Sequence, residues 1–90
     1  MYPTVHVSCK KIIDSTFLRE KTVVIELVDG TDTTGIFPCD RINEDKKLLE
    51  VLLMKEDGDR ALISDVGGNS GGYGFNRGSI WVPRRLIQKP

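Results

Sequence analysis

Long apolar runs are missing from this sequence, which nowhere keeps an uninterrupted apolar stretch of the roughly 18 residues that a membrane helix needs. Residues 1–11 also lack the apolar centre of a secretory signal peptide. No membrane span or leader is therefore expected. These two absences predict a soluble, cytoplasmic protein.

Metal-binding and redox side chains are scarce, with two cysteines, Cys9 and Cys39, and one histidine, His6. A structural zinc site takes four ligands and a catalytic one at least three, and these residues do not have ligand spacing. Two cysteines in a chain without a leader favour a reducing compartment. We expect free thiols, no metal and no cofactor.

An excess of charge of either sign is also missing, because 13 Lys and Arg residues balance 13 Asp and Glu residues. The chain as a whole therefore exerts no long-range attraction on nucleic acid or anionic membranes, and any polyanion site must be local. The run Gly68–Gly72 is similar to the serine-protease Gly-Asp-Ser-Gly-Gly element. His6 lies in an unpatterned segment, however, and the supporting triad is missing. No catalytic residues are predicted, and the protein is not expected to be an enzyme.

The size of the chain allows one domain, residues 1–90, with 39% hydrophobic and 29% charged residues as in a globular protein. A domain of this size buries only about 60–65% of the surface that its unfolded chain exposes. Association of subunits would add to this small core. Self-association is therefore a reasonable expectation from size alone.

Alternating apolar residues predict β-strands through the middle of the chain. Thr22–Val28 reads as a half-buried strand, the pair Asp29-Gly30 as a tight turn, and Thr31–Cys39 as the returning strand. Gly35 interrupts the returning strand. A glycine there suits a sharp bend or a close approach of another backbone, and we expect a bend or bulge.

A second predicted hairpin follows, with strands at Lys47–Lys55 and Arg60–Val66 around the turn Asp57-Gly58. Apolar residues occupy both faces of the first of these strands, so both faces are expected to be buried. A last strand, Ser79–Val82, ends at a proline. Residues 84–90 are expected to form a tail.

Two segments lack a clear strand pattern. In residues 1–21, Val5 and Val7 alternate as in a strand, whereas Ile12, Ile13 and Phe17 have helical spacing, which favours a short helix over residues 9–20. Residues 67–78 are dense in glycine and are expected to form a mobile loop.

Short motifs in residues 17–83 resemble those of the Sm-like family, which includes the LSm and Hfq proteins. Leu27, Gly30, Gly35 and Phe37 match the Leu-x-x-Gly-x4-Gly-x-hydrophobic spacing of the first Sm motif, and Arg77-Gly78 resembles the Arg-Gly pair of the second. The resemblance implies an all-β fold: a short N-terminal helix in residues 1–21 and a five-stranded, strongly bent antiparallel sheet or small open SH3-type barrel in residues 22–83.

The resemblance further implies a ring that binds single-stranded RNA near its pore. The residues expected at the RNA site are Asp40, Arg41, Asn43, Arg77 and Gly78, and the aromatic rings of Tyr73 and Phe75 would stack on bases or instead anchor the loop. Asp40 and Asn43 fall earlier than the family pattern requires. This departure favours an alternative, a viral or mobile-element assembly or protein-interaction module that has lost RNA recognition.

Strand edges are the expected route of assembly. The fourth strand and the last strand are predicted to be the two unpaired edges of the sheet, and both are rich in apolar residues. Pairing one with the other between subunits is heterologous, so repeated contacts close into a ring or run on as a filament. The resemblance selects the closed ring. The resemblance favours a homo-oligomer of six or seven copies, with five possible, and the predicted interface comprises Ala61, Leu62, Ile63, Ile80, Trp81 and Val82.

Overall fold

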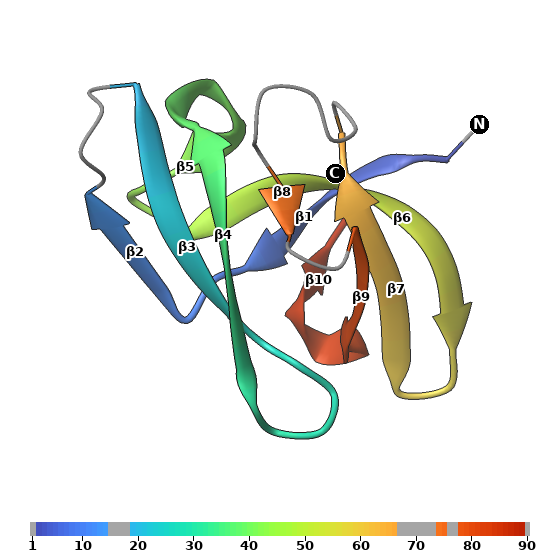
Figure 1. Ribbon diagram of the computed structural model, residues 1–90. Helices are drawn as coiled ribbons and strands as arrows, with labels where there is room; N and C mark the ends of the chain where they lie inside the picture. Colours follow the sequence, from blue (N-terminus) through green and yellow to red (C-terminus); the bar gives the residue numbers. More distant parts are fainter. Residues whose placement is uncertain (1, 15–18, 67–73, 76–77, 90) are drawn as a thin grey trace.

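The computed structural model describes residues 2–14, 19–66, 74–75 and 78–89, and these form strands, turns and two short 3-10 helices without an α-helix. The strands make two open antiparallel sheets (Figure 1). Sheet A has the order β10-β1-β6-β7-β9, with β5 beside β6, and sheet B has the order β2-β3-β4-β8. The bounds are β1 Thr4–Ser8, β2 Lys11–Asp14, β3 Glu20–Glu26, β4 Asp32–Pro38, η1 Cys39–Arg41, β5 Ile42–Asn43, β6 Leu48–Asp57, β7 Arg60–Asp65, β8 Gly74–Phe75, β9 Ser79–Pro83, η3 Arg84–Leu86 and β10 Ile87–Gln88.

The predicted N-terminal helix is wrong, because Lys11–Asp14 forms strand β2 and pairs with β3. Ile12 packs against the core, while Ile13 is 45% exposed, so the two neighbours alternate as strand residues do. Two consecutive β-branched residues also favour an extended backbone. Phe17, whose spacing favours a helix, lies outside the described residues.

The predicted C-terminal tail is also wrong, because residues 84–88 continue the fold. Arg84–Leu86 makes the turn η3, and Ile87–Gln88 pairs with β1 as β10. Ile87 lies opposite the fully buried Val7 and packs against the core, as does Leu86. This apolar contact offsets the entropy lost when the segment is ordered.

The β3–β4 hairpin confirms the first predicted strand pair, with Gly30 at a φ of +89° in the turn. Its register runs from Glu20 opposite Pro38 to Glu26 opposite Asp32 without a shift, so the bulge expected at Gly35 is absent from this pairing. Gly35 instead allows the backbone of β8 to lie close to β4. A Cβ atom there would lie 2.7 Å from the Phe37 ring and 2.8 Å from the Gly74 carbonyl oxygen of β8.

Gly35→Ala should therefore destabilise the fold by about 1–3 kcal/mol, since the added methyl overpacks the contact between β4 and β8. Thermal denaturation followed by circular dichroism measures the effect. Thr34→Ala, at the exposed neighbouring position, is the control. Equal melting temperatures for the two variants would show that β8 moves away at little cost.

The second hairpin, β6–β7, turns at Gly58 with a φ of +62° and contains a bulge at Met54. β7 pairs with β6 on one side and with β9 on the other. The prediction that Arg60–Val66 is an unpaired edge is therefore wrong. The predicted last strand, Ser79–Val82, forms β9, which pairs with β7 and lies at the end of the strand order of sheet A, as expected for an edge strand.

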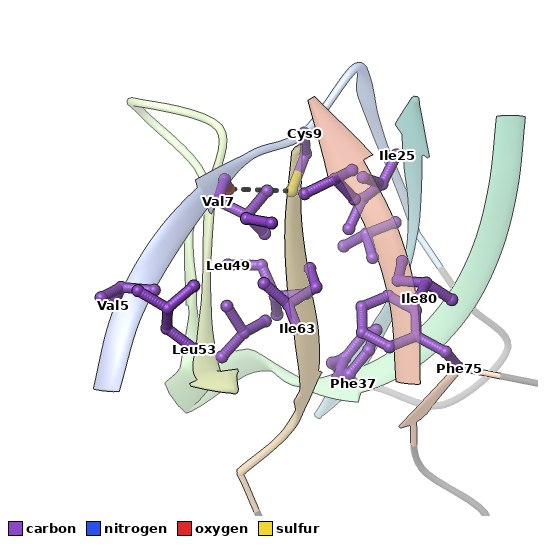
Figure 2. Close-up of a cluster of buried hydrophobic side chains, with 14 residues drawn as sticks. Val5, Val7, Cys9, Ile25, Phe37, Leu49, Leu53, Ile63, Phe75 and Ile80 are labelled. Atoms are coloured by element: carbon purple, nitrogen blue, oxygen red, sulfur yellow. Dashed lines mark hydrogen bonds between the residues drawn. The ribbon is translucent and has the colours of Figure 1, made fainter. Parts of the chain in front are cut away.

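The core lies between the two sheets and draws on nearly every strand (Figure 2). Its largest fully buried side chains include Phe37, Ile25, Leu49 and Ile63. Phe75 of β8 meets Phe37 edge-on, with ring centroids 5.0 Å apart. Four residues predicted at a subunit interface are core residues of the single chain: Ala61, Ile63, Ile80 and Val82.

Candidate functional site

One face of sheet A carries apolar side chains that the core does not use. Along β6, Leu49, Val51 and Leu53 point into the core, so Leu52 points to the other face of the sheet. Leu52 is only half-buried and is not among the side chains packed against the core. The expectation that both faces of this strand are buried is therefore met on one face only.

Leu62 and Trp81 extend this surface onto β7 and β9, where they lie directly opposite each other. Leu52 faces Ser64, which places it diagonally next to Leu62. Met54 is the extra residue of the β6 bulge. We call these four half-buried residues, Leu52, Met54, Leu62 and Trp81, the outer face. It is turned away from sheet B, since the two sheets meet across the core.

Charged side chains border the outer face at both ends. At one end the Arg60 guanidinium lies 4.1 Å from the centre of the Trp81 ring and also pairs with Asp57 at 2.9 Å. Lys55, directly opposite Leu62, adds a second positive charge at that end. At the other end Glu50 lies opposite His6 of β1. One end thus carries a net positive charge and the other a negative charge.

The residues predicted for RNA around η1 are partly committed to the fold. Arg41 donates from Nη1 to Oδ1 of Asp65 at 2.8 Å, and the Asp65 side chain is only 3% exposed. The Asn43 side-chain oxygen accepts a hydrogen bond from the Lys46 backbone at 3.1 Å. Asp40 is exposed. Arg41 therefore acts as the partner of a buried carboxylate, a role that no local sequence pattern indicates.

The glycine-rich segment contributes a core residue. Phe75 is 4% exposed in β8, where it lies opposite Gly35, so its ring is not available to stack on a base in this structure. The alternative expectation, that this aromatic anchors the segment to the fold, matches its position. Gly78 has a φ of +77° and donates its N–H to the Phe75 carbonyl oxygen at 3.0 Å. Tyr73, Arg77 and most of the expected mobile loop lie outside the described residues.

Two surface hollows flank the contact in which the Val28 N–H donates to the Trp81 carbonyl oxygen at 3.1 Å. The larger, about 590 Å³, is lined by Val28, Gly58, Asp59, Pro83, Arg84 and Arg85. The smaller is about 200 Å³ and includes Trp81 in its lining. The arginines of the larger hollow already face carboxylates, since Arg85 contacts both oxygens of Glu26 at 3.0 Å and Arg84 lies 3.8 Å from Glu56. The hollow therefore presents no excess positive charge to a phosphate.

Reactive and metal-binding chemistry is sparse in the part of the chain that the structure describes. No group of three or more His, Cys, Asp or Glu side chains is placed to hold a metal ion there. Cys9 and Cys39 are not joined in a disulfide, and burial raises the pKa of Cys9 to about 12, so its thiol stays protonated at neutral pH. Among the same residues no helix is long and apolar enough to span a bilayer.

Comparisons with protein families, with curated proteins and with solved structures find no match for this chain. Its function is therefore inferred from its own residues.

Proposed function

We propose that this chain is a non-enzymatic assembly module that associates with further copies of itself through a sheet surface. The observation that carries the proposal is the outer face, where four apolar side chains gather on the side of sheet A away from the core. Contiguous apolar surface on a small soluble domain commonly marks an interaction site. Association would also add buried area to a small core.

Two of the residues expected at the subunit interface, Leu62 and Trp81, belong to this surface, whereas their neighbours in sequence are buried. The proposal therefore keeps a second copy as the partner and moves the contact from a strand edge to a sheet face. The motifs resemble those of the Sm-like family, but the described strands form two open sheets and not the single five-stranded sheet or barrel that the resemblance implies. Ring closure and RNA binding remain proposals that only the resemblance supports.

RNA binding has weaker support than assembly in the described residues. Arg41 is held by Asp65, Phe75 is buried, and the net charge of the chain is zero. Neutralisation of phosphates supplies most non-specific affinity for nucleic acid, and the chain has no surplus of positive charge for it. An assembly module without RNA recognition agrees better with these features.

Light scattering coupled to gel filtration, run at several concentrations in the micromolar range, tests the proposal. We expect masses at an integral multiple of the 10.1 kDa of the monomer, with the multiple giving the number of copies. A mass of one chain at every concentration would contradict the proposal. Fluorescence anisotropy with labelled oligo-U and oligo-A at two salt concentrations tests RNA in parallel, because binding to phosphates weakens steeply with salt.

A further inference from the structure

We infer that two copies pack outer face against outer face around a twofold axis that crosses β6 at right angles close to Leu52. This inference rests on the proposed function and names its interface. Stacked sheets lie about 10 Å apart, a separation that apolar side chains such as leucine and tryptophan fill. A twofold contact uses the same patch on both copies, so one self-complementary surface is sufficient.

The charges at the border of the outer face favour a second copy of this chain as the occupant. Glu50 lies at one end of the patch and Lys55 towards the other, separated along the strand by roughly 13 Å, four steps of about 3.3 Å, because Met54 bulges out between them. Rotation by 180° about an axis that lies between the two stacked sheets, at right angles to β6 and midway between the two residues, brings Glu50 of one copy towards Lys55 of the other, and the reverse. Each copy therefore places a charge of opposite sign against each of these two charges on its partner.

The internal ion pairs do not include these two charges, although Asp57, whose pKa is lowered mainly by its hydrogen bond from Arg60, also interacts with the charge of Lys55. Within the described ranges, no ion pair of the chain involves Glu50 or Lys55, whereas most other charges near sheet A are paired. Arg60 is engaged with both Asp57 and Trp81. Because charges at an interface border set register and partner choice, Glu50 and Lys55 would orient the two copies.

Leu62 and Trp81 form the apolar part of the proposed interface beside Lys55. They face each other across β7 and β9, in the region where a partner would exclude water. Tryptophan is enriched among the residues that dominate binding energy at protein interfaces. The Arg60 guanidinium stacks on the Trp81 ring and helps to hold the ring on this surface.

A charge exchange tests the inference. Glu50→Lys and Lys55→Glu should each raise the dissociation constant of the self-complex at least tenfold, because each places like charges together at both ends of a twofold contact. The double variant E50K/K55E should return it to within about threefold of the parent. Analytical ultracentrifugation measures the dissociation constants of the parent, the two single variants and the double variant. Lys46→Glu, in the exposed turn just before β6, is the matched control.

Leu62→Asp is the second variant, and it should make the protein monomeric at concentrations where the parent associates. Circular dichroism and the melting temperature establish that each variant is folded before its mass is compared. A parent that associates while the charge variants and Leu62→Asp associate equally well overturns the inference and leaves the proposed function standing. A parent that is monomeric throughout overturns the proposed function itself.

Discussion

Arg41→Ala is expected to destabilise the protein by about 3 kcal/mol, because it removes the partner of a buried carboxylate. The Asp65 side chain is 3% exposed, and its Oδ2 has no hydrogen-bond partner among the residues that the structure describes, so the bond from Arg41 to Oδ1 is its main compensation there. For a domain of this size the loss corresponds to a fall in melting temperature of roughly 15 °C. Urea denaturation gives the free energy of unfolding.

Two further variants make this test specific. Arg85→Ala also removes an arginine from an ion pair, but its side chain is 65% exposed, so a change within about 1 kcal/mol is expected. The double variant R41M/D65L replaces the buried pair with apolar groups and should be more stable than Arg41→Ala alone. The interpretation fails if Arg41→Ala costs no more than Arg85→Ala.

Phe37→Ala should lower the free energy of unfolding by about 3–5 kcal/mol, a loss at least as large as that expected for Arg41→Ala. Phe37 is fully buried, and its ring supports both Phe75 and the close approach of β8 at Gly35. Its removal leaves a cavity between the sheets and weakens the attachment of β8. Since small domains are stable by only about 5–15 kcal/mol, part of the population would unfold at physiological temperature.

Ile36→Ala is the matched control, because Ile36 is the preceding residue of β4, points to the opposite face and is 39% exposed. It should change the free energy of unfolding by less than about 1 kcal/mol. Equal losses for the two variants would contradict the assignment of Phe37 to the core. A double-mutant cycle with Phe75→Ala would then measure how strongly the two rings depend on each other.

Local sequence signals predicted the hairpins of this protein well. The Asp29-Gly30 and Asp57-Gly58 turns lie where expected, with both glycines at positive φ, and the strands around them match the predicted ranges to within a few residues. These features depend on interactions between near neighbours in the chain. Alternation of apolar residues and the φ preference of glycine act over a few residues, so they can be recognised without the rest of the fold.

The candidate site was only partly foreseeable. Leu62 and Trp81 were expected at an interface because they lie in apolar strands, but so were Ala61 and Val82, which the fold buries. Alternation shows which residues share a face and does not show which face meets the core. The face that meets the core is the one that packs against sheet B, and the apolar pattern of a single strand does not indicate where sheet B lies.

The sequence by itself determined the all-β class and the two Asp-Gly hairpins, because these depend on local backbone preferences. Only the tertiary structure decided that Lys11–Asp14 is a strand, that Ile87–Gln88 pairs with β1, and that β7 lies inside a sheet. The pairings of β10 with β1 and of β9 with β7 each need a partner strand that is distant in sequence or reached through a long connection, whereas β2 pairs with β3, the next strand along the chain. The free energy gained by such pairing overrides weak local preferences, and it also determines which apolar surface is left for a second molecule.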